Sequence, residues 1–404
     1  MTITITQALD LIYSHTKATK TKLLPIENAL GYVLAEDIIA THNLPPYDNS
    51  AMDGYAIKLL ASDTRIVKGS IFAGDSGDFS LKGNEALKIM TGGKIPNGCD
   101  AVVPIEHVES SGDTITITKE PKQAQNIRLM AEDITAGATL LARGTKLAAH
   151  HIMLLASQGI SHINVHKKPR VAVFASGNEL KMHFESVEAH QLYNTNTIAT
   201  QMRSYELGCE VEFLGTAKDS IKDFGSFIDS ALGSDLIITT GGVSVGDADL
   251  TKESFANFGH EIYFDSVEIK PGKPTTFGRI GDTLILNLPG NPLAAMLCYE
   301  IFARSIILAL SGSSSKFINP LIVPLDGEYS NRSRKTSLIP GNFDGKSFKP
   351  LPKVSSGMVR PIAIADSFMV ISKECSELKK GELVKVIPTR FELNSPMQTS
   401  LLNL

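Results

Sequence analysis

The sequence predicts a multidomain protein of mixed α/β and β structure. It combines a central parallel α/β sheet domain, a β-rich insertion domain, a small helical linking domain and a C-terminal β-barrel. Residues 169–315 alternate apolar strands with helical stripes, which is typical of βαβ units whose helices cover both faces of a parallel sheet. Residues 44–139 and 316–404 instead carry short strands separated by Gly, Pro, Asp and Ser.

Composition supports a folded protein and excludes several classes. Apolar residues make up 43% of the 404 residues and charged residues 20%, as in globular proteins. The formal net charge of −4 argues against a dedicated nucleic-acid binder. No run of about 18 uninterrupted apolar residues and no secretory signal is found, so neither a membrane span nor export is expected. Four scattered cysteines favour a cytoplasmic location over a disulfide framework or a zinc site.

The central domain is expected to contain four strands and four helices. Short apolar runs predict buried strands at 171–174, 211–214, 236–239 and 283–287. Helical periodicity predicts helices at 194–207, 221–228, from about 249 to a point before Gly259, and 292–310.

The flanking zones complete a four-domain organisation. Residues 66–68, 101–103 and 114–118 read as strands of the insertion, and 321–323, 368–371 and 383–387 as strands of the barrel. The segments 16–43 and 140–168 read as more helical, with one helix marked by Ile152, Leu155 and the stop at Gly159. The predicted domains are 1–43 with 140–168 (linking), 44–139 (insertion), 169–315 (sheet domain) and 316–404 (barrel).

Ligands of an open parallel sheet bind at the carboxyl ends of its strands. That rule selects the segments 176–179, 215–219, 239–247 and 288–292, all rich in Gly, small hydroxyl residues or Asn. The segment after 239 is the most distinctive, because Gly241 and Gly242 allow a phosphate to approach backbone N–H groups and Ser244 adds a hydroxyl. Asp247 and Asp249 beside an anion imply a bridging Mg²⁺. The alternative is an ordinary glycine turn with Asp caps.

Two further motifs suggest anion and acid chemistry. Lys270 and Lys273 on a Pro-stiffened turn could hold an oxyanion, although a solvated basic turn is the alternative. In the insertion, the stretch 50–56 places Asp53 beside Gly54, a pair that is also common in plain hairpin turns. The stretch 289–292 has the same ambiguity as the lysine turn, because Pro292 after Asn291 can simply be the first residue of a helix and have no role in binding.

The order of the motifs resembles the MoeA family, molybdopterin molybdenumtransferase, also known as the gephyrin E domain. The similarity runs from about residue 7 to 390 through eight motifs. They are Pro45-Pro46-Tyr47-Asp48-Asn49-Ser50-Ala51-Met52-Asp53-Gly54-Tyr55-Ala56, Ile89-Met90-Thr91-Gly92, Gly98-Cys99-Asp100-Ala101-Val102-Val103, Asn126-Ile127-Arg128 with Glu132-Asp133-Ile134, Ser176-Gly177-Asn178-Glu179-Leu180, residues 240–249, Lys270-Pro271-Gly272-Lys273-Pro274 and Leu288-Pro289-Gly290-Asn291-Pro292.

The resemblance implies a MogA-like central domain and the last step of molybdenum cofactor synthesis. Molybdate would be inserted into adenylylated molybdopterin, with Mg²⁺-dependent release of AMP. It also implies a homodimer whose cleft is shared between the sheet domain of one subunit and the insertion of the other. Transient contact with a molybdopterin adenylyltransferase is implied as well, whereas nucleic acid and membranes are not expected partners.

Residue roles follow from the same resemblance. The pterin-phosphate cradle would comprise Gly241, Gly242, Ser244, Gly246 and Asp247, with Pro289 and Pro292 beside it. The cleft carboxylates and hydroxyl would be Asp53, Thr91, Asp133, Glu179, Asp219 and Asp249, of which Asp53, Asp219 and Asp249 are the candidate Mg²⁺ ligands. The molybdate pocket would use Lys270, Lys273 and Pro274, with Arg334 and Ser356 on its far wall.

The chain departs from the family pattern in places. Ala131 stands where Gly is usual, residues 354–357 read Val-Ser-Ser-Gly rather than Gln-Gly-Ser-Gly, and residues 365–367 read Ala-Asp-Ser rather than Ala-Asn-Gly. These differences concern mainly the C-terminal assignments.

Two other functions compete with the transferase. A non-catalytic scaffold would have no need of the acidic set Asp53, Asp133, Asp219 and Asp249. A nucleotide pyrophosphatase built on the same sheet domain would have no need of the Lys270–Lys273 turn.

Overall fold

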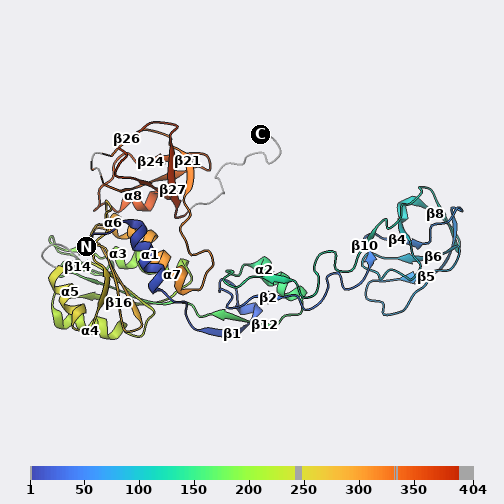
Figure 1. The fold of residues 1–404 in the computed structure, drawn as a ribbon, viewed down its shortest axis with the longest axis horizontal. Coiled ribbons are helices and arrows are strands. Elements are labelled where there is room, and N and C mark those ends of the chain that lie inside the picture. The colour runs from blue at the N-terminus through green and yellow to red at the C-terminus, as the bar shows by residue number, and fades with distance from the viewer. Residues whose placement is uncertain (1, 242–247, 332, 334, 391–404) are drawn as a thin grey trace. The chain divides into compact units, whose positions relative to one another are not determined.

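The computed structural model describes residues 2–241, 248–331, 333 and 335–390, with residues 248–251 described as backbone only. The chain divides into two compact units (Figure 1). Unit 1 comprises residues 1–35, 144–148 and 162–404, and unit 2 comprises residues 36–143 and 149–161. The four predicted domain boundaries stay a prediction at this level.

Unit 1 is built on a six-stranded sheet in the order β16-β13-β17-β20-β19-β18. The four predicted strands form its parallel part: β13 (Arg170–Ser176), β16 (Glu210–Ala217), β17 (Leu236–Thr240) and β20 (Thr283–Leu288). The sequence analysis did not predict the two antiparallel strands that extend the sheet, β19 (Thr276–Ile280) and β18 (Glu261–Phe264). The sheet is therefore mixed, with a parallel core.

Successive residues of each central strand enter opposite cores. Val171, Val173 and Ile238 belong to one buried cluster, whereas Ala172 and Ile237 belong to the other. Because side chains alternate across a strand, both faces of the sheet are covered, as predicted. Helices α4 (Ile221–Ala231) and α5 (Ala248–Ala256) cover the second face, and α3 (Asn196–Glu206) contacts β13 and β16.

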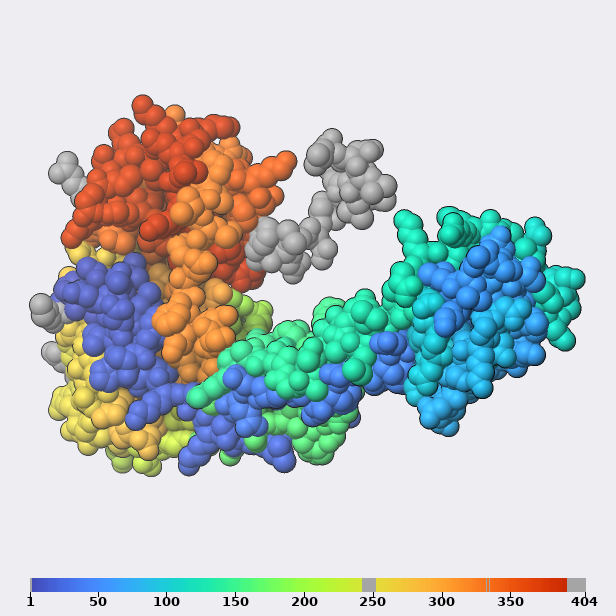
Figure 2. Space-filling view, turned by 45° about the vertical axis from the view of Figure 1, so that its right-hand side comes forward, coloured from blue at the N-terminus to red at the C-terminus, as the bar shows by residue number. Residues whose placement is uncertain are grey.

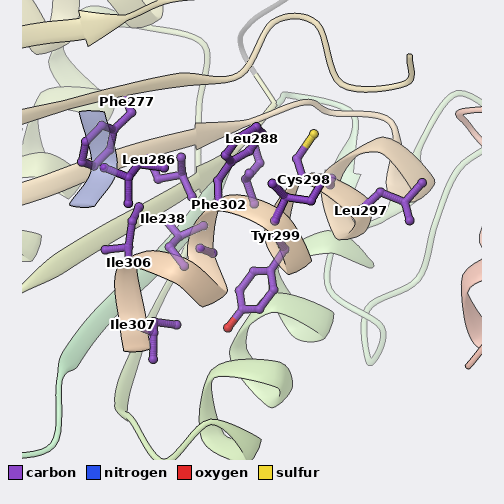
Figure 3. Packing of buried hydrophobic residues seen from close by; sticks show 14 of the residues in the cluster. Ile238, Phe277, Leu286, Leu288, Leu297, Cys298, Tyr299, Phe302, Ile306 and Ile307 are labelled. Atoms are coloured by element: carbon purple, nitrogen blue, oxygen red, sulfur yellow. The ribbon is translucent and has the colours of Figure 1, made fainter. Parts of the chain in front are cut away.

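The predicted helix 292–310 forms the centre of the first core. It consists of α6 (Pro292–Cys298), a π-helical turn (Tyr299–Ala303) and α7 (Arg304–Leu310). Figure 3 shows Phe302 and Ile306 of this helix near strand residues such as Leu286 and Ile238, whereas the Tyr299 ring points away from the strands. The Tyr299 hydroxyl lies 2.7 Å from that of Ser204, a residue of α3. By length and composition alone the helix could span a membrane, but 89% of its most apolar window is buried in the protein, as in a core helix.

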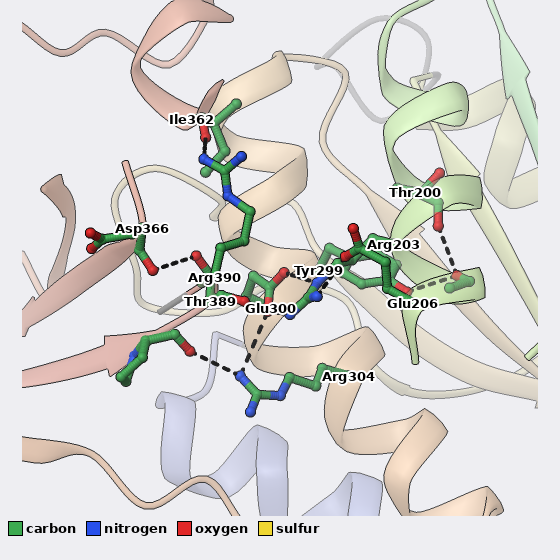
Figure 4. Close-up of polar contacts among 12 residues, drawn as sticks. Thr200, Arg203, Glu206, Tyr299, Glu300, Arg304, Ile362, Asp366, Thr389 and Arg390 are labelled. Carbon is green, nitrogen blue, oxygen red and sulfur yellow. Dashed lines mark hydrogen bonds and ion pairs between the residues drawn. The ribbon is translucent and has the colours of Figure 1, made fainter. Parts of the chain in front are cut away.

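A buried ion pair fastens α3 to the π-helical turn (Figure 4). Arg203 Nε lies 2.7 Å from Glu300 Oε1, and Arg203 also donates to the Thr389 carbonyl at 3.0 Å. Burial disfavours the charged guanidinium, but the bonds and charge of Glu300 outweigh it and raise the Arg203 pKa. Arg304 approaches Glu300 at 3.7 Å and donates to the Pro388 carbonyl. The pair thus connects the sheet domain to the end of the last C-terminal strand.

The N-terminal segments differ from the sequence prediction. Helix α1 (Ile5–His15), which was not predicted, begins at a capping box formed by Thr4 and Gln7 and buries Ala8 and Ile12 in the first core. In Figure 2 this blue helix lies on yellow and orange residues of the same unit. The segment predicted to be helical after residue 16 instead forms β1 (Thr21–Pro25), a 3₁₀ turn (Ile26–Asn28) and β2 (Ile38–Ile39). Strand β1 pairs with β12 (His162–His166).

The C-terminal strands form a small antiparallel sheet domain where the sequence predicted a β-barrel. Antiparallel strands follow the order β21-β27-β25-β23-β24, with bounds Leu321–Pro324, Leu383–Pro388, Ser367–Ile371, Ser337–Phe343 and Phe348–Pro350. A bridge between Leu325 and Phe348 joins the two edges, and both side chains lie in the barrel core. A short ladder pairs β22 (Tyr329–Ser330) with β26 (Glu377–Leu378), and helix α8 (Arg360–Ile364) packs on β23.

Unit 2 is mostly β-structure, as predicted for the insertion. Its main sheet has the order β7-β4-β6-β5-β9-β8, with bounds Ala101–Pro104, Gly54–Ile57, Glu85–Ile89, Thr64–Ile71, Thr114–Ile117 and Val108–Ser111. Two short ladders pair β3 (Asn49–Ser50) with β10 (Ile127–Arg128) and β2 with β11 (Thr139–Leu141). The predicted helix near Ile152 and Leu155 is confirmed as α2 (Ala149–Ser157).

Candidate active site

The carboxyl ends of the parallel strands open onto a cavity of about 750 Å³ in unit 1. Each of the four segments that the sequence rule selected contributes to its lining. The contributing residues are Ser176, Gly177 and Glu179 after β13, Asp219 after β16, Thr240 and Gly241 after β17, and Pro289, Gly290, Asn291 and Pro292 after β20. We name this hollow the strand-end cavity.

Glycine at position 241 lets two strand ends meet. Gly241 has φ +90°, and a Cβ atom there would lie 2.6 Å from the Ser176 carbonyl oxygen. A Cβ at Gly290 would be 3.5 Å from the Gly241 Cα. A side chain at position 241 would therefore strain the backbone and push β13 away from β17.

Two acidic residues predicted for this cavity lie on its wall. Asp219 is exposed and exchanges hydrogen bonds with Asn178: each backbone amide donates to the other side chain, at 3.2 Å in both cases. The carboxylate of Glu179 folds back towards Gly177, where a Cβ would lie 2.8 Å from it. The strand ends thus hold two carboxylates near the space where a ligand would enter.

Two buried asparagines at the start of α3 also shape the cavity, and the sequence analysis missed them. Asn196 donates from Nδ2 to the Gly290 carbonyl at 2.7 Å, which ties α3 to the loop after β20. Asn194 donates to the Thr216 hydroxyl at 3.1 Å and accepts from the Thr197 amide. The detectable signal was the polar Asn-Thr-Asn run placed directly before a helical stripe.

A second cavity of about 710 Å³ adjoins the first and contains the predicted lysine turn. Pro274, Pro289 and Asn291 line both cavities. Lys270, Lys273 and Ser356, all predicted for an oxyanion pocket, line the second one, which we name the lysine cavity. Lys270 and Lys273 are exposed, and neither forms an ion pair within the described residues.

The lysine turn is fixed from both sides. The Lys270 amide donates to the Thr336 carbonyl at 2.8 Å, and the Lys270 carbonyl accepts from the Leu338 amide at 2.9 Å. Gly272 has φ +120°, and a Cβ there would overlap the Cys298 sulfur of α6. Barrel strand β23 and helix α6 therefore hold the backbone of this turn, while both lysine side chains stay exposed, so the alternative of a solvated basic turn stays open.

The barrel contributes a third lysine that the sequence analysis did not select. Lys335 lines the lysine cavity, one position beyond the predicted Arg334, which lies outside the described residues. The buried Asn331 fixes the loop: its Nδ2 donates to the Lys335 carbonyl at 3.1 Å, and its Oδ1 accepts from the Ser333 and Ser337 hydroxyls. Three lysines from two segments therefore line one cavity, and their positive charges would favour a dianion there.

In unit 2 the structure brings Asp53 and Thr91 together. Asp53 Oδ1 accepts from the Thr91 amide at 2.7 Å and from its hydroxyl at 2.8 Å. The hairpin-turn alternative for Asp53-Gly54 is wrong, because Gly54 begins β4 and a Cβ there would overlap the Val103 backbone of β7. Asp133 is exposed, and its backbone amide donates to the Leu44 carbonyl at 3.0 Å. No hydrogen bond between Asp133 and Asp53 is found in the described chain.

Several predicted residues cannot be placed. Gly242, Ser244, Gly246 and Asp247 lie outside the described residues, and Asp249 belongs to α5 without a described side chain. Among the residues that are described, no three His, Cys, Asp or Glu side chains cluster as a metal site. Asp53 and Asp219 each keep one carboxylate oxygen for which no protein partner is found in the described chain, and such an oxygen suits a hard cation.

The fold defines a multidomain α/β protein with two adjoining cavities at the carboxyl edge of its sheet, one of them lined by lysines. Three family models match the chain. They are the MoeA N-terminal region (domains I and II) at residues 3–159, a probable molybdopterin binding domain at 172–309, and the MoeA C-terminal region (domain IV) at 323–389. The chain belongs to the MoeA family.

Named relatives agree with this assignment. The chain is 38% identical over 299 residues to a molybdopterin molybdenumtransferase of Haemophilus influenzae, covering 73% of the chain and 74% of the relative. It is 31% identical over 400 residues to that of Staphylococcus epidermidis, covering 96% of each. A solved structure of a molybdopterin biosynthesis MoeA protein from Pyrococcus horikosii superposes with TM-score 0.83 at 29% identity, over 97% of this chain and all of that one. The predicted family and fold class are confirmed.

Proposed function

We propose that this chain is a molybdopterin molybdenumtransferase of molybdenum cofactor biosynthesis. It would insert molybdate into adenylylated molybdopterin and release AMP. The names of its relatives and its three matching domains support this function.

The observation that carries the proposal is the junction of the two cavities. The strand-end cavity offers backbone, hydroxyl and amide groups, whereas the lysine cavity offers Lys270, Lys273 and Lys335. A phosphorylated pterin in the first and molybdate, a compact dianion, in the second would meet at the shared wall of Pro274, Pro289 and Asn291. A simple pyrophosphatase would have no use for the second cavity.

The acidic residues would serve cleavage of the adenylyl group. Asp53, Asp219 and Asp249 are the residues that would hold Mg²⁺, with Thr91 orienting Asp53, and Glu179 and Asp133 beside them as further cleft carboxylates. When bound, Mg²⁺ would neutralise charge on the phosphate groups. The two Thr91 bonds lower the pKa of Asp53 and so favour its ionised form, which suits binding of a cation better than acceptance of a proton.

The proposal includes a homodimer, as the family resemblance implies, in which Asp53 of one subunit serves the strand-end cavity of the other. It also includes a cytoplasmic location, which the four free cysteines support, and transient transfer of substrate from a molybdopterin adenylyltransferase. Light scattering that finds an active monomer at micromolar concentration would remove the shared cleft from the proposal.

Reconstitution of a cofactor-free molybdoenzyme tests the function. The chain is incubated with adenylylated molybdopterin, molybdate and Mg²⁺, and the mixture is added to the apoenzyme. The proposal predicts recovered activity that requires the chain, with the triple variant Lys270→Ala, Lys273→Ala and Lys335→Ala as an inactive control. Recovery that is equal with and without the chain would contradict the proposed function.

A further inference from the structure

A small hollow lies elsewhere in unit 1, between the β1–β12 ladder and the end of α7. It encloses about 20 Å³, roughly the space of one oxygen-sized group, and shares no lining residue with the two site cavities. Lys146, His166, Lys167 and Lys168 line it, together with Tyr32 and Ser313. We name it the basic hollow.

The positive charge around the basic hollow is not neutralised by ion pairs. No ion pair within the described chain includes Lys22, Lys146, Lys167 or Lys168. Asp235 is an acidic side chain in this neighbourhood: its charge, like those of Lys146 and Lys168, acts on the pKa of the buried Cys209 thiol. Its carboxylate accepts from the Arg170 amide at 2.7 Å. One carboxylate offsets at most one of the four ammonium charges, so these five groups together stay positively charged.

Two of the basic groups, Lys22 and Lys168, are also held in place before any ligand arrives. Lys22 Nζ lies 3.0 Å from the Tyr32 hydroxyl and 4.5 Å from its ring centre, and Lys168 Nζ lies 5.0 Å from the same ring. Strand pairing sets their backbones, since the Lys167 amide donates to the Lys20 carbonyl at 2.8 Å. Groups ordered in advance lose less entropy when they bind an anion.

His166 adds an oriented ring to the wall. It is 6% exposed, and its Nδ1 lies 2.8 Å from the Thr19 carbonyl oxygen. A carbonyl only accepts, so Nδ1 carries the hydrogen and Nε2 is the remaining polar atom of the ring. Gly312 packs its backbone on this ring, because a Cβ at that position would overlap it. Glycine is therefore required at position 312, just after the end of α7.

From these observations we propose that the basic hollow is a second anion site, which binds a phosphate group as the free ion or as a monoester. One oxygen would enter the hollow and the others would face Lys146 and Lys168 at its exposed rim. Tetrahedral dianions match several separate ammonium donors better than a planar carboxylate does, because their oxygens point in four directions. The site is independent of the proposed transferase reaction.

Isothermal titration of inorganic phosphate into the full-length chain at constant ionic strength tests the proposal. Since phosphate could also enter the lysine cavity, the titration is repeated on Lys273→Ala. Lys146→Ala and Lys168→Ala report on the basic hollow, and Lys353→Ala is the matched control, an exposed lysine that lines neither hollow. Thermal melts confirm that each variant is folded.

The proposal predicts saturable binding that survives in Lys273→Ala and in Lys353→Ala. The dissociation constant should rise about tenfold or more in Lys146→Ala and Lys168→Ala, as expected for a lost charge-assisted hydrogen bond. A parallel titration with O-phosphoserine identifies a monoester site if it binds at least as tightly as the free ion. Binding that disappears in Lys273→Ala and is unchanged in Lys168→Ala would overturn the proposal, as would no saturation below about 10 mM.

Discussion

Thr91 donates two hydrogen bonds to the same carboxylate oxygen of Asp53, from its backbone amide at 2.7 Å and from its hydroxyl at 2.8 Å. Both bonds lower the pKa of Asp53, and the backbone bond has the larger effect, although the residue is fully exposed. Both bonds use Oδ1, so the arrangement favours the charged carboxylate, and no protein partner of Oδ2 is found in the described chain.

The variant Thr91→Val should raise the pKa of Asp53 relative to the wild type, because it removes the hydroxyl donor and keeps the amide. A lowered folded-state pKa stabilises the fold above the unfolded-state pKa, and this contribution is lost as pH falls through the folded value. Carbon-detected NMR titration of the Asp side chains measures the change. An unchanged Asp53 pKa in the variant would show that the hydroxyl bond has no influence.

Because of the Arg203–Glu300 pair, replacing Glu300 is expected to lower the stability of the fold strongly. Glu300→Ala leaves the guanidinium of Arg203 largely buried without its main partner, so the free energy of unfolding should fall by about 3–5 kcal/mol. Glu206→Ala is a matched control, since Glu206 binds the same guanidinium at 2.7 Å but is 58% exposed. Its loss should cost less than about 1 kcal/mol in the same urea titration. Equal losses in the two variants would contradict the role given to burial.

His260 should make the fold sensitive to mild acid. Both ring nitrogens are buried beside Phe255, and neither has a hydrogen-bond partner among the residues that the structure describes. Burial lowers the His260 pKa to about 4. The unfolded chain binds this proton more readily, so stability is full above the unfolded-state pKa and declines as pH falls towards 4. Near pH 5 the loss is on the order of 2 kcal/mol.

The variant His260→Leu removes this titration, so its stability should fall less between neutral pH and about pH 5 than that of the wild type. Urea unfolding at the two pH values provides the comparison, and any uniform packing effect cancels in the difference. Identical pH dependence in both proteins would mean that His260 does not control acid sensitivity.

Lys273→Ala should raise the molybdate concentration needed for half-maximal insertion by roughly 10- to 150-fold, the effect of losing a hydrogen bond of about 1.5–3 kcal/mol. Pterin binding should change little, because Lys273 lines the lysine cavity and not the strand-end cavity. Titrating the variant with each ligand separately measures both. Weakened pterin binding with an unchanged molybdate requirement would show that molybdate was placed in the wrong cavity.

Lys335→Ala is expected to act in the same direction as Lys273→Ala, since the two lysines face one cavity from different domains. Lys346→Ala, an exposed lysine between β23 and β24 that does not line that cavity, serves as the control and should leave the molybdate requirement unchanged.

Local patterns were sufficient to predict the parallel core of the sheet. Every residue of β17, Leu236–Thr240, is buried, and a strand covered on both faces shows this as a continuous apolar run. Strands β18 and β19 carry no comparable run, since Glu261, Ile262 and Arg279 are exposed. The predicted helix 292–310 was correct in extent, but its π-helical turn coincides with Glu300, whose partner Arg203 is 97 positions away in the sequence. No local pattern contains that contact.

The candidate site shows the same division between local and distant information. Turn chemistry and strand ends predicted Gly241, Asp219 and the lysine turn. Asn196 and Lys335 were missed because their importance depends on tertiary contacts: a bond to Gly290 in one case and a loop fastened by Asn331 in the other. The Asp53-Gly54 alternative failed for a related reason, since the need for glycine arises from the neighbouring strand β7 and not from a turn.

The central claim is that adenylyl cleavage and molybdate binding belong to one reaction in the adjoining cavities. The most direct measurement is the rate of AMP release from adenylylated molybdopterin with Mg²⁺, with and without molybdate, in the wild type and in Lys273→Ala. The account predicts that molybdate accelerates release in the wild type and that the variant needs a higher molybdate concentration for the same rate. AMP release that is fast and indifferent to molybdate in both proteins would contradict the account and indicate a nucleotide pyrophosphatase.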